Sequence, residues 1–183
     1  MTKTALIVID MQQDMADRLA AGRDAAPDGV PDRIAALLAR ARAAGVPVLH
    51  VHHDDPDPTA AIRLDRPGGA PMPCAAPLAG ERVVVKHGSS GFAGTALERY
   101  LRDLEASRLV VVGAVLGFCV SSTIREAVAR GFAVDLVGDA VLSFDLPDGR
   151  GGTIPAATVR AVHGMTLALD FARWQSAEAV VFA

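Results

Sequence analysis

The middle of the chain reads Leu109-Val110-Val111-Val112-Gly113-Ala114-Val115-Leu116-Gly117-Phe118-Cys119, without a charged residue. Its first four residues are apolar, which is typical of a strand covered on both faces. Gly113 and Gly117 allow the backbone to turn sharply. We therefore expect a buried strand that ends close to Gly113.

A helix is expected directly after this strand. From Cys119 onward, Val120, Ile124 and Val128 recur at helical spacing, and Gly131 is a typical residue just past a helix end. The thiol of Cys119 is then expected in the first turn of the helix. Free N–H groups and the positive end of the helix dipole favour a thiolate there.

Strand-like and helix-like segments alternate along the 183 residues, as in one α/β domain. The expected strands are 5–9, 46–51, 82–86, 109–113, 133–138 and 180–182. The expected helices are 30–41, 95–104 and 155–172, besides the one that begins at Cys119. Repeated crossovers imply parallel strands with helices on both faces. The prediction is a three-layer α-β-α fold in a single domain, residues 1–183.

Composition narrows the possible functions. About half of the residues are apolar (51%), enough for a sizeable core, and the formal charge of −3 offers no basic surface for nucleic acid or anionic lipid. The longest uncharged apolar stretch, 109–120, is too short to span a bilayer, and the first residues show no signal-peptide pattern. Two cysteines suit a reducing compartment, with Cys74 interpreted as an incidental loop thiol. We expect a cytoplasmic protein that acts on a small molecule and binds neither nucleic acid nor membrane.

Three reactive residues fall at the carboxyl ends of expected strands, where parallel sheets carry their chemistry. Asp10 follows the first strand, Lys86 ends the third and Cys119 follows the fourth. Each alone has a simpler interpretation: a helix cap, a solvated strand end and a small core residue. Together they form a neutralised set, in which Asp10 takes the thiol proton and the ammonium offsets the carboxylate charge.

The segments around these residues resemble three motifs of the isochorismatase-like cysteine hydrolase family, within the nicotinamidase/isochorismatase superfamily. The matching segments are 6–14, 86–97 and 113–120, followed by Asp139-Ala140 at the next strand end. The resemblance covers nearly the whole chain in order. It implies a six-stranded parallel sheet with helices on both sides.

The resemblance also implies a catalytic triad of Asp10, Lys86 and Cys119. It implies a cis peptide bond between Ala114 and Val115, and an oxyanion hole formed by the N–H groups of Val115 and Cys119. Asp10 would act as base, acid and base again while Cys119 forms a thioester with a carbonyl carbon. The expected substrate is a small amide, ureide or lactam. No cofactor is expected, and we expect a homo-oligomer, a dimer or a tetramer.

Six side chains near the motifs are candidates for lining the substrate pocket, with core packing as an equal alternative for the aromatic ones. They are Met15, His52, Phe92, Leu116, Phe118 and Phe144. Leu116 departs from the family pattern, which usually has Thr there, and Met15 stands where an aromatic is common. The segment 54–80, rich in Pro, Asp, Gly and Ala, is expected to be a long surface loop that is functional or forms a lid.

The cluster of His50, His52, His53 and Asp54 raises the question of a metal, because the nicotinamidase branch holds an ion near the end of the second strand. No histidine occurs between His53 and His87, so the set of ligands looks incomplete and we expect no metal. On a strand, His50 and His52 point to one face and His53 to the other. Histidines held by hydrogen bonds near the pocket are the preferred interpretation, and a metal site is the alternative.

Two other functions stay open. The same fold could act as an isochorismatase on a vinyl ether, but acid catalysis by an Asp suffices there and Cys119 argues against it. The chain could also be a catalytically silent binding or assembly module, which the departure at Leu116 leaves open. Labelling of Cys119 by dilute iodoacetamide would distinguish a reactive thiol from a silent one.

Overall fold

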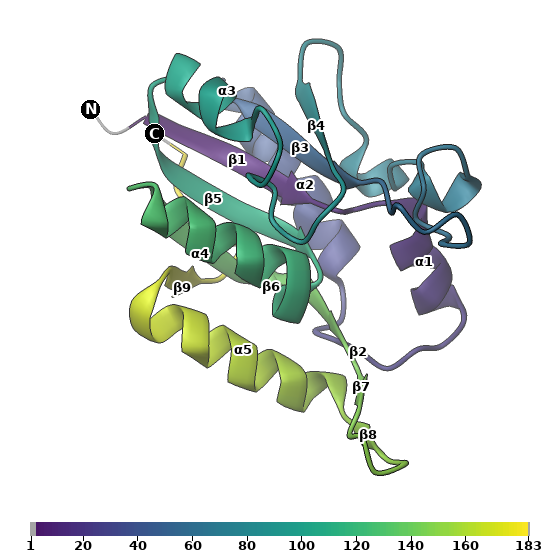
Figure 1. The fold of residues 1–183 in the computed structure, drawn as a ribbon. Helices are drawn as coiled ribbons and strands as arrows, with labels where there is room; N and C mark the ends of the chain where they lie inside the picture. The colour runs from purple at the N-terminus through teal and green to yellow at the C-terminus, as the bar shows by residue number, and fades with distance from the viewer. Residues whose placement is uncertain (1–2, 183) are drawn as a thin grey trace.

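A computed structural model describes residues 3–182 of the chain and shows a twisted parallel sheet between two layers of helices (Figure 1). Six strands run parallel in the order β4-β3-β1-β5-β6-β9. Their bounds are β1 Lys3–Ile9, β3 Val48–His53, β4 Arg82–Lys86, β5 Ala106–Ala114, β6 Ala133–Phe144 and β9 Arg173–Gln175. The short β2 (Ala25–Ala26) pairs antiparallel with the far end of β6. The predicted six-stranded parallel sheet is confirmed.

The helices cover both faces of this sheet. They are α1 Gln13–Ala20, α2 Val30–Ala43, α3 Leu97–Asp103, α4 Ser121–Ala129 and α5 Ala156–Asp170. Leu101 of α3, Ile124 of α4 and Leu167 of α5 pack into one core with the sheet, and these helices lie in front of it in Figure 1. Met15 of α1 and Leu37 of α2 belong to the core on the opposite face. The three-layer α-β-α prediction is confirmed, and among residues 3–182 no helix has the length and apolar character to cross a membrane.

The end of β5 approaches β1 so closely that only glycine fits there. Gly113 has φ +128°, and a Cβ at this position would overlap the carbonyl oxygen of Ile9. The pairing of β5 with β6 also shifts register between Val111 and Gly113. The strand continues only to Ala114, so the residues that follow it lie next to the end of β1.

The turn between β5 and α4 differs from a plain helix start. Residues Leu116–Val120 form a π-helical turn, and α4 begins only at Ser121. The N–H groups of Phe118 and Val120 both donate to the carbonyl oxygen of Val115, at 3.0 and 3.3 Å. Cys119 therefore lies in a turn that leads into the helix, and N–H groups beside it are already occupied by the backbone.

Two predictions of secondary structure were wrong. The last strand is β9 rather than residues 180–182, because Arg173 pairs with Asp135 of β6 while Trp174 packs where Gly138 leaves room. Val180 instead packs as a coil residue against the α2 face. Helix α1 was not predicted: half of its residues are polar, and only Asp14 and Met15 are buried.

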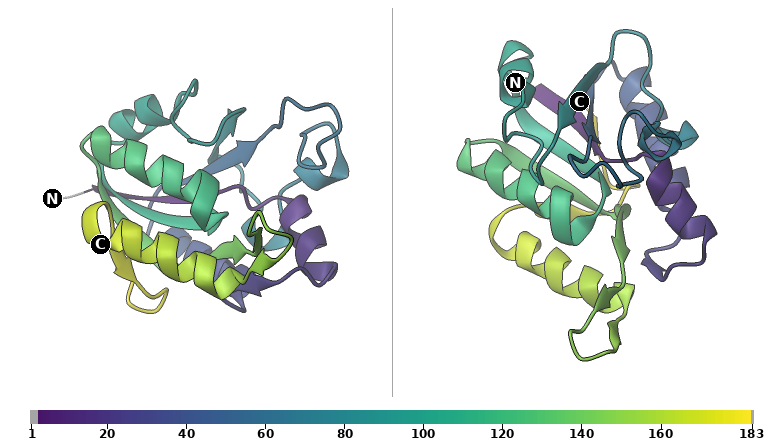
Figure 2. Two further views of the ribbon diagram at one scale, coloured as in Figure 1. Left: turned by 60° about the horizontal axis from the view of Figure 1, so that its bottom comes forward. Right: turned by 45° about the vertical axis from the view of Figure 1, so that its right-hand side comes forward.

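The segment 54–80 is a long connection without strands, as expected, and contains two short 3-10 turns, η1 (Pro67–Gly69) and η2 (Pro73–Ala75). Its second half is tied to the start of α1: the N–H of Gln13 donates to Ala70 O at 2.7 Å, and the N–H of Met72 donates to Met11 O at 2.9 Å. Figure 2 shows this segment beside α1, while the hairpin of β7 (Leu146–Pro147) and β8 (Thr153–Ile154) projects near α5.

Candidate active site

Asp10 lies directly after β1, at the carboxyl edge of the sheet. Its backbone has φ +49°, an uncommon value for a residue with a side chain, and its N–H donates to Val51 O at 2.8 Å. The residue is 3% exposed. The left-handed backbone turns the chain away from the strand at the point where the carboxylate is presented.

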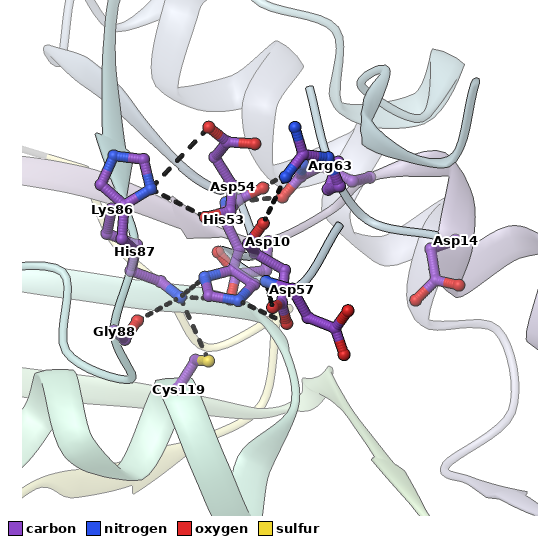
Figure 3. A network of polar contacts seen from close by, with 12 residues as sticks. Asp10, Asp14, His53, Asp54, Asp57, Arg63, Lys86, His87, Gly88 and Cys119 are labelled. Carbon is purple, nitrogen blue, oxygen red and sulfur yellow. Dashed lines mark hydrogen bonds and ion pairs between the residues drawn. The ribbon is translucent and has the colours of Figure 1, made fainter. Parts of the chain in front are cut away.

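Lys86 is the last residue of β4 and is fully buried. Its Nζ lies 2.9 Å from Asp10 Oδ2, 3.2 Å from Cys119 Sγ and 3.0 Å from the carbonyl oxygen of Gly88. Figure 3 shows the lysine side chain reaching between the carboxylate and the sulfur. The three residues that the sequence placed at strand ends thus meet around one ammonium group.

Burial sets the protonation states of the acid and the thiol. It raises the pKa of Asp10, and the ammonium of Lys86 offsets only part of that effect. Burial and the neighbouring charge of Asp10 raise the pKa of the Cys119 thiol to about 12, against the opposing effect of Lys86. Burial thus disfavours the thiolate expected at a helix start, and the Cys119 thiol lies beside an acid whose pKa is raised.

One oxygen of Asp10 has no internal partner. Among the described residues, Oδ1 is buried without a hydrogen-bond partner, while Oδ2 binds Lys86. The neighbouring Cys119 thiol opposes part of the rise in the pKa of Asp10. Oδ1 can therefore accept the proton of the thiol while Oδ2 keeps its hydrogen bond from Lys86.

The peptide bond between Ala114 and Val115 is cis, as the family resemblance implies. Both residues line a cavity of about 520 Å³ that opens at this edge of the sheet. Phe118 and Cys119 line the same cavity. Val115 and Cys119, whose N–H groups were predicted to form an oxyanion hole, thus border the same cavity.

Only some of the predicted pocket residues lie at this cavity. Met15 and Phe118 line it, and Phe118 is 51% exposed. Phe92, Leu116 and Phe144 do not line it, because each is buried in the core: Phe92 stacks on Phe132, and Arg23 lies over the ring of Phe144. The departure at Leu116 is therefore a matter of core packing rather than of a substrate contact.

His52 was the wrong histidine to place at the cavity. Along β3, His50 and His52 share one face, and it is His53 that lines the cavity. Burial lowers the pKa of His52 to about 4, and its ring lies edge-on to that of His50. His53, and not His52, is the residue of β3 in register with Lys86 of β4.

The rest of the cavity wall was not predicted from the sequence. The further lining residues are Arg18, Asp55, Pro56, Ile62, His87, Gly88 and Ser89. Asp55, Pro56 and Ile62 come from the first half of the segment 54–80, so this segment forms one side of the cavity. Its closure as a lid stays a prediction.

The histidines do not form a set that fits a metal ion. Within residues 3–182, no group of three or more His, Cys, Asp or Glu side chains is arranged to hold one. The Nε2 of His50 lies 2.9 Å from Glu81 Oε2, and both ring nitrogens of His53 face polar partners, Lys86 and Asp55. The histidines at the cavity thus have hydrogen-bonding partners of their own.

Comparisons with known proteins show the family to which the chain is similar. A family model described as Isochorismatase domain matches residues 4–154. The chain is 38% identical over 159 residues to streptothricin hydrolase of Streptomyces noursei. This alignment covers 84% of this chain and 60% of that relative. A shorter match, 39% identical over 70 residues, is to N-carbamoylsarcosine amidase of an Arthrobacter species and covers 36% of this chain and 26% of that protein.

A solved structure is similar over almost the whole chain. It is a protein of the isochorismatase family from Chromobacterium violaceum, with a TM-score of 0.89 and 34% identity. The alignment covers 96% of this chain and 90% of that structure.

Proposed function

Since the chain belongs to the isochorismatase family of hydrolases, we propose that it cleaves the C–N bond of a small amide, ureide or lactam through a thioester on Cys119. The observation that carries the proposal is the position of Lys86 Nζ, 2.9 Å from the Asp10 carboxylate and 3.2 Å from the Cys119 sulfur. An amidase and a hydrolase among the relatives support the class of bond.

The proposed first half of the reaction begins with proton transfer from the Cys119 thiol to Asp10. The sulfur attacks the carbonyl carbon, and the carbonyl oxygen, now negatively charged, accepts hydrogen bonds from the N–H groups of Val115 and Cys119. Asp10 then gives its proton to the nitrogen as the C–N bond breaks. Ammonia or an amine leaves, and the acyl group stays on the sulfur as a thioester.

The second half regenerates the enzyme. Asp10, again a carboxylate, takes a proton from water, and the resulting hydroxide attacks the thioester carbon. The C–S bond breaks, the carboxylic acid departs, and the proton held by Asp10 returns to the sulfur. Lys86 keeps its charge throughout and stabilises whichever of its two neighbours is anionic.

The pKa directions support this division of roles. An acid with a raised pKa is a better base than an ordinary carboxylate, and it can also return the proton to a leaving group. A thiol with a pKa of about 12 does not ionise on its own at neutral pH, so it needs that base at the moment of attack. The cavity of about 520 Å³ has room for a small molecule in front of the sulfur.

A panel of primary amides, ureides and lactams, assayed for release of ammonia or amine, tests the proposal. We expect at least one compound to be hydrolysed by the wild-type protein and not by Cys119→Ala. A slowly deacylating substrate should add its acyl mass to the peptide that contains Cys119. Full activity of Cys119→Ala on a hydrolysed compound would overturn the proposal and would point to acid catalysis by Asp10, as expected for a vinyl ether substrate.

A further inference from the structure

His53, the last residue of β3, lies between the catalytic lysine and a carboxylate. Its Nδ1 is 3.3 Å from Lys86 Nζ, and its Nε2 is 3.3 Å from Asp55 Oδ2. The ring lines the same cavity as Cys119, and its side chain is 15% exposed. Figure 3 shows the imidazole beside the end of the lysine side chain.

These contacts determine where the ring carries its proton. An ammonium group has only donors, so the Nδ1 of His53 must be the unprotonated nitrogen that accepts from Lys86. The hydrogen is then on Nε2, which donates to the Asp55 carboxylate. A carboxylate behind the ring selects this tautomer, as second partners of functional histidines commonly do.

We propose that His53, oriented by Asp55, is a positioning residue that holds the Lys86 ammonium between Asp10 and Cys119. The inference rests on the proposed function and adds a residue to its machinery. A lysine side chain has four flexible methylene groups, and burial alone does not fix where its ammonium lies. His53 supplies a side-chain acceptor in addition to the backbone carbonyl of Gly88 that Lys86 also contacts.

The number of partners gives His53 a specific task. Lys86 has three hydrogens and four polar neighbours, Asp10, Gly88, His53 and Cys119. A neutral thiol is the weakest acceptor among the four. At rest the hydrogens therefore go to the carboxylate, the carbonyl and the imidazole. When the sulfur becomes anionic, the neutral imidazole is the acceptor that can release its hydrogen to it.

The backbone around His53 is held independently of any substrate. The side chain of Gln12, which is fully buried, accepts from the N–H of His53 at 2.7 Å and donates to the carbonyl oxygen of His53 at 2.9 Å. The same amide donates to Gly69 O at 3.0 Å. The Gln12 amide thus fixes the backbone that carries the ring, and it joins the ends of β1 and β3 to the segment 54–80.

Two substitutions of nearly equal shape separate positioning from packing. His53→Asn keeps an acceptor oxygen where Nδ1 stands, whereas His53→Leu has a similar outline and no acceptor. His52→Asn is the matched control, because His52 is on the same strand and outside the cavity. The readout is the rate of alkylation of Cys119 by iodoacetamide at neutral pH, measured by peptide mass. It needs no substrate, and Cys74 serves as the internal reference thiol.

We expect His53→Leu to lower the alkylation rate of Cys119 about tenfold, the effect of a lost hydrogen bond to a charged group, and His53→Asn to restore most of it. His52→Asn should leave the rate at the wild-type level. Equal rates for the Leu and Asn variants would overturn the positioning role while leaving the proposed function intact. A wild-type Cys119 that reacts no faster than Cys74 would instead overturn the proposed function, and this inference with it.

Discussion

Asp10 and Lys86 form an ion pair of 2.9 Å in which the side chains are 5% and 0% exposed. Both charges are largely shielded from water, so each depends on the other. Removing one partner of such a pair leaves an uncompensated buried charge, which typically costs about 3–5 kcal/mol. The pair therefore links the stability of the fold to the chemistry of the site.

Lys86→Met should lower the free energy of unfolding, and by more at pH 8 than at pH 5. Without the ammonium, the raised pKa of Asp10 rises further, because Lys86 is what opposes the effect of burial. A group whose folded pKa is raised holds its proton longer in the folded state, so stability is lost as the pH rises above the unfolded value. We expect a loss of about 3 kcal/mol at pH 8. Urea denaturation at the two pH values measures it, and an equal loss at both would contradict the pairing.

Cys119→Ala should abolish hydrolysis while leaving the fold in place. Loss of a nucleophile that acts together with its base costs at least about 10³-fold in kcat/KM. Cys119 is only half-buried, so the free energy of unfolding should change by less than about 1 kcal/mol. Kinetics on a hydrolysed compound and a urea titration give the two quantities. A large loss of stability would mean that the residue serves the core instead.

Gly113→Ala should be one of the most damaging single methyl additions in the chain. The added Cβ would overlap the carbonyl oxygen of Ile9 at φ +128°, and neither backbone can move without breaking the sheet. We expect a loss of about 3 kcal/mol or more. Gly149→Ala is the control: its φ is +74° and nothing lies within 4 Å of the new Cβ, so about 1 kcal/mol is expected. Similar losses for both variants would show that the close approach to β1 is unimportant.

His52 should make the protein less stable at acid pH. Its pKa is lowered from 6.5 to about 4 by burial, so the unfolded chain binds a proton between these values and the folded protein does not. Stability is then present above pH 6.5 and falls as the pH drops toward 4, by about 2–3 kcal/mol in total. His52→Phe should flatten this part of the urea-denaturation profile. A matching substitution of His87, whose side chain is 66% exposed, is the control. An unchanged slope in His52→Phe would refute the assignment of this pH dependence to His52.

Leu116→Thr, which restores the residue common in the family, should not improve this protein. Leu116 is fully buried in the core on the α4 side and does not line the cavity. Loss of its methyl packing and burial of a hydroxyl should cost about 2 kcal/mol. Differential scanning calorimetry of the variant and the wild type measures the change in melting temperature. A gain in hydrolysis without a loss of melting temperature would indicate that the position faces substrate after all.

Several features could be predicted from the order of residues alone. The apolar runs at 5–9, 82–86 and 109–113 are local signals, and each became part of a parallel strand. Parallel strands bring their carboxyl ends to one edge, so Asp10, Lys86 and Cys119 could be expected to meet before any coordinates were known. The homo-oligomer and the cytoplasmic location stay predictions.

Side-chain surroundings were beyond reach of the sequence because they depend on what packs from other parts of the chain. Whether His52 or His53 faces the cavity follows from the pairing of β3 with β4, and Leu116 and Phe144 are in the core because helices and loops from elsewhere cover them.

The sequence by itself determined which chemical groups stand at the strand ends: an acid, an amine and a thiol. Only the tertiary structure decided their protonation, because burial raises the pKa of both Asp10 and Cys119 where an isolated helix start would have favoured a thiolate. Burial is a property of the assembled layers. No local pattern of residues specifies it, and it is what raises the pKa of the carboxyl group beside the sulfur.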